Sequence, residues 1–122
     1  MMHIIYVEDD PSNIALVERV VRMAHDTLTT YTTAEEALLH IQPGDADLIL
    51  TDVDFGEDNM TGLELTQGLR SKGIDVPIVA ITAYDLQEYV RWSEMVGSDG
   101  FIVKPVNVPE LLNLLEHYRP VE

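Results

Sequence analysis

Apolar stretches typical of β-strands alternate five times with amphipathic stretches typical of helices, and this alternation limits the possible folds more than any other feature. The five predicted strands are His3–Val7, Thr27–Thr32, Asp47–Thr51, Pro77–Ile81 and Gly100–Val103. The third and fourth contain unbroken apolar runs, which are typical of strands covered on both faces. Repeated strand–helix units of this kind predict a parallel sheet with helices on both faces and right-handed crossovers.

A predicted helix follows each strand, and most of these helices begin at residues that favour a helix start. Asp10 precedes Pro11 at the first helix, and the segment from Thr33 to Glu36 has the capping-box pattern. The other predicted helices are Gly62–Gly73, Asp85–Val96 and Asn107–Tyr118. For a chain of 122 residues, we expect one domain over residues 1–122 with no separate output domain. Its fold is predicted to be α/β, a flavodoxin-like doubly wound five-stranded sheet with strand order 2-1-3-4-5 and five helices.

Polar and charged residues follow four of the predicted strands. They are Glu8, Asp9 and Asp10 after the first, Asp52 and Asp54 after the third, Thr82 after the fourth and Lys104 after the fifth. In an open parallel sheet, ligands bind outside the carboxyl ends of the strands, at the point where the winding reverses. Each residue alone has an ordinary explanation, since acids and threonines cap helices and lysines are solvated. Their joint placement at one edge of the sheet predicts a site.

Carboxylates gathered at that edge would repel one another by about 4 kcal/mol per pair at 4 Å and an effective dielectric constant near 20. Oxygen ligands without cysteine or histidine suit Mg²⁺, which shares its coordination shell with phosphate. A carboxylate such as Asp52 can also act as a nucleophile and form an aspartyl phosphate. Lys104 and Thr82 would then stabilise the phosphoryl oxygens.

Composition excludes several other classes of protein. The chain has no cysteine, so it has no disulfides or cysteine metal sites, and this suits a cytoplasmic protein. Acidic residues outnumber basic ones by 22 to 7, and the net charge of −15 argues against direct nucleic-acid binding while favouring basic partner surfaces. No apolar run approaches the ~20 residues that cross a bilayer, and no signal peptide is visible, so we expect no membrane insertion.

These motifs together resemble the receiver domain of two-component response regulators, in its single-domain, chemotaxis-regulator-like form. The pieces that carry the resemblance occur in family order over nearly the whole chain. They are Ile4–Asp10, Leu48–Asp52, Gly62–Leu65, Ile81–Ala83 and Gly100–Pro105. The resemblance implies a phosphorylation-dependent signalling switch that catalyses only its own phosphoryl transfer and dephosphorylation. It also implies a sensor histidine kinase or a histidine phosphotransfer protein as donor, and an unknown downstream protein target.

The resemblance further implies a role for each site residue. Asp52 corresponds to the phosphoacceptor, Thr82 to the switch hydroxyl and Lys104 to the lysine that contacts the phosphoryl group. The expected ligands of Mg²⁺, for which Mn²⁺ can substitute, are Glu8, Asp9, Asp52 and the backbone carbonyl of Asp54. Phe101 corresponds to the aromatic residue that changes rotamer on activation, Asp10 is left as a helix cap, and the Lys104–Pro105 bond is expected to be cis.

Two surfaces are predicted to contact other proteins. The family resemblance places kinase or phosphotransfer docking near Ile14 and Ala15. Trp92 and Met95 share an outer face of the fourth predicted helix, where the alternatives are a partner interface and packing of Trp92 on neighbouring helices.

The sequence departs from the family pattern near the phosphoacceptor. The segment from Asp52 to Gly62 is about two residues longer than the common form and lacks its proline, which predicts a more mobile or a reshaped loop. Asp54 and Tyr84 occupy positions that affect how long the phosphoryl group survives, so we expect an altered dephosphorylation rate.

Three alternatives remain at this point. Asp52 and Asp54 also match the first motif of haloacid-dehalogenase-like phosphatases, although that motif usually lies near the N-terminus. A flavodoxin-like cofactor binder would need a phosphate-binding loop after the first strand, where Glu8, Asp9 and Asp10 would repel a phosphate, so no organic cofactor is expected. A receiver-like interaction module would act without phosphorylation.

Overall fold

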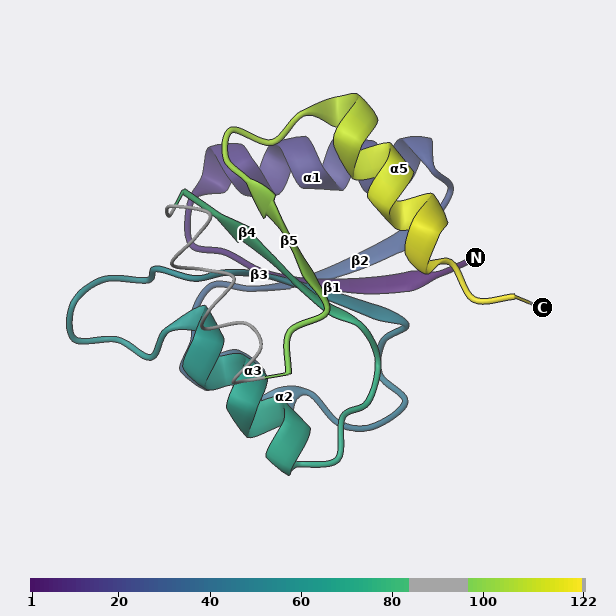
Figure 1. Ribbon diagram of the computed structural model, residues 1–122. Helices are drawn as coiled ribbons and strands as arrows, with labels where there is room; N and C mark the ends of the chain where they lie inside the picture. Colours follow the sequence, from purple (N-terminus) through teal and green to yellow (C-terminus); the bar gives the residue numbers. More distant parts are fainter. Residues whose placement is uncertain (84–96, 122) are drawn as a thin grey trace.

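The structure, a computed structural model, describes residues 1–83 and 97–121 of the chain. Within these residues, five parallel strands form a single sheet in the order β2-β1-β3-β4-β5 (Figure 1). The strands are β1 His3–Val7, β2 Thr27–Tyr31, β3 Leu48–Asp52, β4 Ile78–Thr82 and β5 Gly100–Val103. The predicted fold class and strand order are therefore confirmed.

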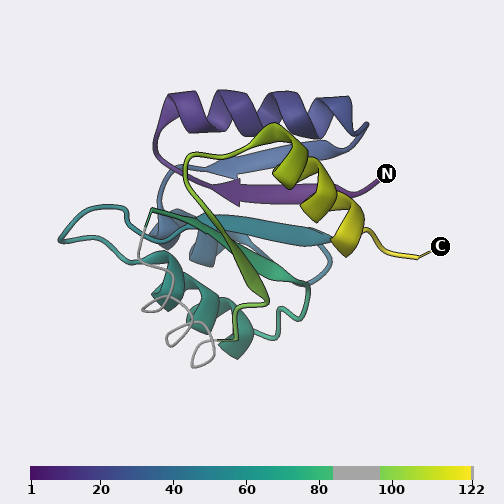
Figure 2. The ribbon, with the colours of Figure 1, turned by 45° about the horizontal axis from the view of Figure 1, so that its top comes forward.

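The described helices cover the sheet in pairs, with α1 and α5 on one face and α2 and α3 on the other (Figure 2). Their bounds are α1 Pro11–Met23, α2 Ala34–His40, α3 Gly62–Ser71 and α5 Val108–Tyr118. The predicted fourth helix, Asp85–Val96, lies outside the described residues, and so do Tyr84, Trp92 and Met95. No helix in the described parts of the chain has the length and apolar character needed to span a bilayer.

Side-chain caps start each described helix. Asp10 accepts a hydrogen bond of 2.8 Å from the Ser12 N–H at α1, and Thr33 accepts one of 3.1 Å from the Glu36 N–H at α2. The complete reciprocal capping box forms at α3, where Thr61 and Glu64 each accept a hydrogen bond from the other's backbone N–H. Asp10 is thus a helix cap, as the family resemblance implied.

Two strands reach further toward the site than the sequence predicted. The predicted third strand ended at Thr51 and the fourth at Ile81, but β3 ends at Asp52 and β4 at Thr82. The parallel ladder explains both differences, because Asp52 pairs with Ile81 and Thr82 pairs with Val103. The backbones of the two predicted site residues are therefore held by the sheet rather than by loops.

The side chains of β1 alternate between two apolar cores, as the pleat of a strand requires. Ile4 and Tyr6 lie in the core under α1 and α5, whereas Ile5 and Val7 lie in the core against α2 and α3. β2 is threonine-rich and partly exposed, which agrees with its predicted place at the edge of the sheet.

Candidate functional site

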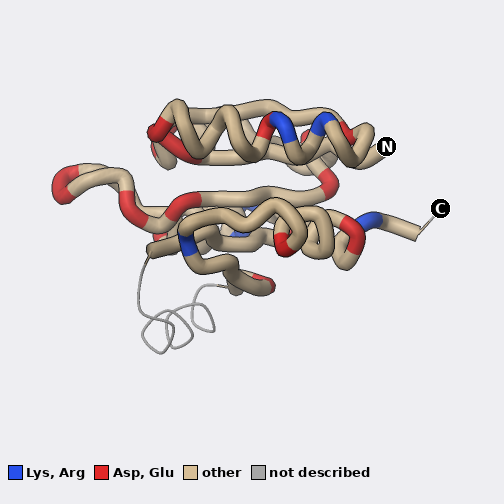
Figure 3. Tube along the Cα trace, turned by 90° about the horizontal axis from the view of Figure 1, so that it is seen from above, with Lys and Arg blue, Asp and Glu red and all other residues tan. Residues whose placement is uncertain are grey.

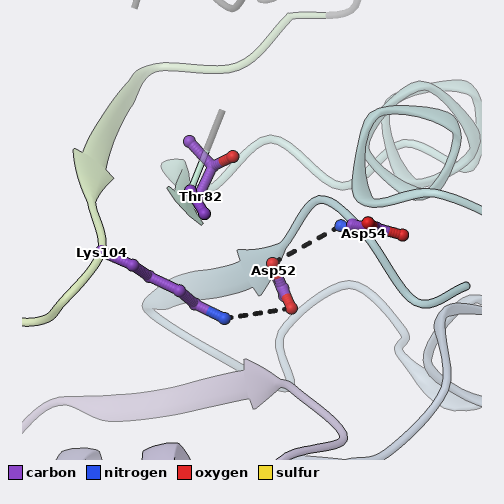
Figure 4. A pocket seen from close by; sticks show the side chains of 5 residues that line it. Asp52, Asp54, Thr82 and Lys104 are labelled. Atoms are coloured by element: carbon purple, nitrogen blue, oxygen red, sulfur yellow. Dashed lines mark hydrogen bonds and ion pairs between the residues drawn. The ribbon is translucent and has the colours of Figure 1, made fainter. Parts of the chain in front are cut away.

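The carboxyl ends of β1, β3, β4 and β5 meet at one edge of the sheet, and the predicted site residues gather there. An open pocket at this edge is lined by Asp52, Asp54, Thr82, Ala83 and Lys104. Figure 4 shows the side chain of Lys104 reaching from the end of β5 toward Asp52 at the end of β3, with Thr82 above them.

Asp52 is 7% exposed, and several groups hold its carboxylate. Its Oδ1 accepts a hydrogen bond of 2.7 Å from the Val53 N–H, and its Oδ2 lies 3.2 Å from Lys104 Nζ. Burial and the charge of Glu8 raise the pKa of Asp52 to about 6, although Lys104 and the Val53 N–H oppose the shift. Asp52 also lines the open pocket at this edge of the sheet.

Three carboxylates converge beside this pocket. Glu8, Asp9 and Asp52 each offer an oxygen atom, and these atoms lie within 4.8 Å of one another. Burial, followed by the charge of Glu8, raises the pKa of Asp9. A set of oxygen donors with surplus negative charge fits a hard divalent cation such as Mg²⁺.

Lys104 links two of these carboxylates. Its Nζ lies 3.0 Å from Glu8 Oε2 and 3.2 Å from Asp52 Oδ2, so one ammonium group bridges the ends of β1 and β3. Burial alone would lower the pKa of Lys104, but the hydrogen bond that Lys104 donates to Glu8 and the charge of Asp52 outweigh it and raise the pKa. The backbone N–H of Lys104 donates a hydrogen bond of 2.8 Å to the Thr82 carbonyl. The peptide bond between Lys104 and Pro105 is cis, as the resemblance implied.

The other predicted residues lie around this centre or outside it. Thr82 is buried, and the exposed Asp54 lies at the rim of the pocket. Phe101 is half-buried on β5 and packs against Val53 and Ala80 rather than lining the pocket. On α1, Ile14 is half-buried against the core and Ala15 is exposed.

The longer loop between β3 and α3 follows a path held by specific contacts. Phe55 is buried in the core against α2 and α3, and Asn59 Nδ2 donates a hydrogen bond of 2.7 Å to the Phe55 carbonyl. The Met60 N–H donates to Glu35 Oε1 of α2 at 3.2 Å. These contacts tie the loop to the core and to α2.

Tyr6 also contacts this site, although it was not predicted from the sequence. The Tyr6 hydroxyl donates a hydrogen bond of 2.9 Å to Glu8 Oε2 in a buried environment. Burial, followed by the charge of Glu8, raises the pKa of Tyr6 above its usual value, so the hydroxyl stays protonated. Two signals could have identified it: residues i and i+2 of a strand point to the same face, and a buried tyrosine hydroxyl requires a partner.

Comparison with known proteins agrees with this geometry. The family described as "Response regulator receiver domain" matches residues 4–116. The heme response regulator HssR of Staphylococcus saprophyticus is 29% identical over 106 residues, and the match covers 87% of this chain and 46% of that protein. This chain therefore spans less than half the length of that relative.

Two solved structures share both fold and sequence features with this chain. The chemotaxis response regulator CheY4 of Vibrio cholerae is 29% identical with a TM-score of 0.85, over 97% of this chain and 98% of that one. The receiver domain of the sensor histidine kinase PA1611 of Pseudomonas aeruginosa, solved with a magnesium ion coordinated in its active site cleft, is 27% identical with a TM-score of 0.83, over 96% of each chain. On the family match, which extends over most of its length, this chain belongs to the response regulator receiver domains.

Proposed function

We propose that this receiver domain accepts a phosphoryl group on Asp52 in a Mg²⁺-dependent reaction and signals through contacts with other proteins. The observation that carries the proposal is the bridge that Lys104 makes between Asp52 and Glu8, at a pocket that Thr82 also lines. Receiver domains are phosphorylated by histidine kinases and bind Mg²⁺ at an acidic pocket. The proposed donor is accordingly a sensor histidine kinase or a histidine phosphotransfer protein.

The chemistry assigned to the protein is nucleophilic substitution at phosphorus. A carboxylate oxygen of Asp52 forms a bond to phosphorus, while the bond between phosphorus and the donor's imidazole nitrogen breaks and its electron pair leaves with the imidazole. Lys104 offers a positive charge and Thr82 a hydroxyl donor to the oxygens of the transferred group. The backbone N–H of Val53 holds the carboxylate in place at 2.7 Å.

Glu8, Asp9 and Asp52 would hold the metal ion, with the backbone carbonyl of Asp54 as the further proposed ligand. When bound, Mg²⁺ supplies positive charge that offsets the repulsion between these carboxylates and an incoming phosphoryl group. Mn²⁺ is proposed to substitute, because it accepts the same oxygen donors.

The proposal is tested by incubating the protein with acetyl phosphate and Mg²⁺ and measuring its intact mass. We expect the mass of one added phosphoryl group in the wild type, and none after Asp52→Asn or chelation of Mg²⁺. The matched control is Asp54→Asn, which alters a neighbouring exposed carboxylate, keeps the backbone carbonyl and should still be modified. Unchanged modification of Asp52→Asn would refute the assignment.

A second measurement separates a receiver domain from a phosphatase. A haloacid-dehalogenase-like phosphatase would hydrolyse phosphomonoesters with many turnovers, whereas a receiver domain accepts one phosphoryl group and hydrolyses only that. The placement of Asp52 on β3, after a complete βαβα segment, supports the receiver domain. We expect no steady release of phosphate from a phosphomonoester.

A further inference from the structure

Tyr6 is a fully buried tyrosine in the core beneath α1 and α5, and its hydroxyl points out of that core into the acidic site. The ring lies among aliphatic side chains such as Ile4 and Leu50, where a phenylalanine would pack equally well. The hydroxyl donates to Glu8 Oε2 at 2.9 Å. Packing therefore accounts for the ring, but the oxygen atom has another effect, which is to hold a carboxylate of the site.

The two oxygens of Glu8 have different surroundings. Oε2 accepts hydrogen bonds from Tyr6 at 2.9 Å and from Lys104 at 3.0 Å. Oε1 accepts a longer hydrogen bond of 3.3 Å from the Asp10 N–H. Glu8 is 1% exposed, so protein groups take the place of water around Oε2, and the orientation of the carboxylate depends on them.

The two donors to Glu8 Oε2 differ in whether they also contact Asp52. Lys104 is shared, because its Nζ also lies 3.2 Å from Asp52 Oδ2, where the proposed phosphoryl group would attach. Tyr6 donates its single hydroxyl hydrogen to Glu8, from a ring fixed by the core. A Lys104 that turns toward phosphoryl oxygens leaves Tyr6 in contact with Glu8.

We infer that Tyr6 is a positioning residue of the acidic site, whose hydroxyl orients Glu8 beside Asp9 and Asp52 and so sets the affinity of the site for Mg²⁺. This inference rests on the proposed function. Groups that orient metal-binding side chains change metal affinity by about 10–100-fold when they are removed. The effect of Tyr6 should lie near the lower end, because Lys104 still contacts the same oxygen of Glu8.

The test is the dissociation constant of Mg²⁺, measured by isothermal titration calorimetry without a phosphoryl donor. We expect Tyr6→Phe, which removes one oxygen atom and keeps the ring, to weaken Mg²⁺ binding about tenfold. The matched control is Tyr118→Phe, because the Tyr118 hydroxyl donates to the Asp99 carbonyl at 3.3 Å, away from the acidic site. That control should bind Mg²⁺ as the wild type does.

A double-mutant cycle with Glu8→Ala separates positioning from packing. If Tyr6 acts through Glu8, Tyr6→Phe should cause no further loss of Mg²⁺ affinity in a Glu8→Ala protein. An unchanged affinity of Tyr6→Phe, or an equal loss with and without Glu8, would overturn the inference. If the wild type binds Mg²⁺ and is modified at Asp52, and Tyr6→Phe binds Mg²⁺ equally well, the inference alone is rejected. If the wild type neither binds Mg²⁺ nor is modified at Asp52, the proposed function is rejected as well.

Discussion

At Gly62 the backbone of α3 meets the backbone of β3 directly behind the proposed phosphoacceptor. The Gly62 N–H donates to the Val53 carbonyl at 2.9 Å, and a Cβ atom added at Gly62 would collide with the backbone carbonyl of Asp52. That carbonyl is also fixed by the Thr51 hydroxyl at 2.8 Å. The absence of a side chain at one residue thus lets the helix approach the strand that carries Asp52.

A Gly62→Ala substitution should therefore destabilise the protein, although alanine usually favours a helix over glycine by about 0.5–1 kcal/mol. We expect a loss of about 1–3 kcal/mol in the free energy of unfolding, measured by urea denaturation. Acetyl phosphate should also modify Asp52 more slowly. Gly68→Ala on the same helix is the control, because its Cβ would meet the flexible end of Leu38 at 2.9 Å. Equal stability of the two variants would contradict this account.

At the scale of elements, one ion pair ties the end of α5 to the segment before β2. Arg119 Nη1 and Nη2 each lie 2.8 Å from a carboxylate oxygen of Asp26, and the Met2 N–H donates to Asp26 Oδ1 at 2.9 Å. Burial alone would raise the pKa of Asp26, but the hydrogen bonds from Arg119 and Met2 outweigh it and hold the pKa below its usual value. The ionised pair thus joins the C-terminal helix to both β1 and β2.

Because the pKa of Asp26 is lower in the folded state than its unfolded value of about 3.9, the pair stabilises the fold above that pH. The contribution disappears as the pH falls through the folded-state pKa. We expect Asp26→Asn to lower the free energy of unfolding by about 1.5–3 kcal/mol at neutral pH. The difference from wild type should shrink below about pH 4 in urea titrations over a pH series.

The control for this pair is Glu116→Gln, because Glu116 contacts the same arginine from the surface with a side chain that is 71% exposed. Its effect at neutral pH should be less than about 1 kcal/mol. A deficit of Asp26→Asn that stayed constant from neutral to acid pH would show that the pair does not act through ionisation.

At the scale of the whole molecule, a net charge of −15 surrounds a site that already concentrates carboxylates. Figure 3 shows acidic residues spread over the described trace. The loop between β3 and α3 contains Asp54, Glu57 and Asp58. Such a charge destabilises a compact chain through self-repulsion and attracts cations. Added salt can therefore act in two ways: any salt screens the repulsion between the acidic residues, and a divalent cation can also bind at the proposed site.

Mg²⁺ should stabilise the protein more than NaCl does at the same ionic strength, because specific binding adds to screening. At ten times its dissociation constant, the ion adds about 1.4 kcal/mol to the free energy of unfolding. Thermal denaturation in matched MgCl₂ and NaCl should show this excess. Asp9→Asn should lose the excess but keep its response to NaCl, and equal effects of the two salts on the wild type would argue against a metal site.

Features that depend on local sequence could be predicted without the structure. The run Leu48–Leu50 predicted a buried strand because continuous apolar character is a local property, and Asp10 and Thr33 predicted helix starts for the same reason. The rule that ligands bind outside the carboxyl ends of parallel strands predicted that Asp52 and Lys104 share a site, and both line the pocket there. The predicted bounds of β1 and β5 were correct, but β2 ends one residue earlier than predicted, and β3 and β4 end one residue later. Ladder pairing with a neighbouring strand decides where a strand stops.

The sequence by itself determined the order of elements, the parallel sheet and the set of residues at its edge, since these follow from apolar periodicity, capping and connection rules. Tertiary structure alone decided that Lys104 reaches Glu8, 96 residues earlier in the chain, as well as Asp52. It also decided that Tyr6 holds Glu8 and that α3 lies against the Asp52 carbonyl. These contacts depend on distances of about 3 Å between side chains and backbones from different elements, and packing, not local pattern, sets such distances.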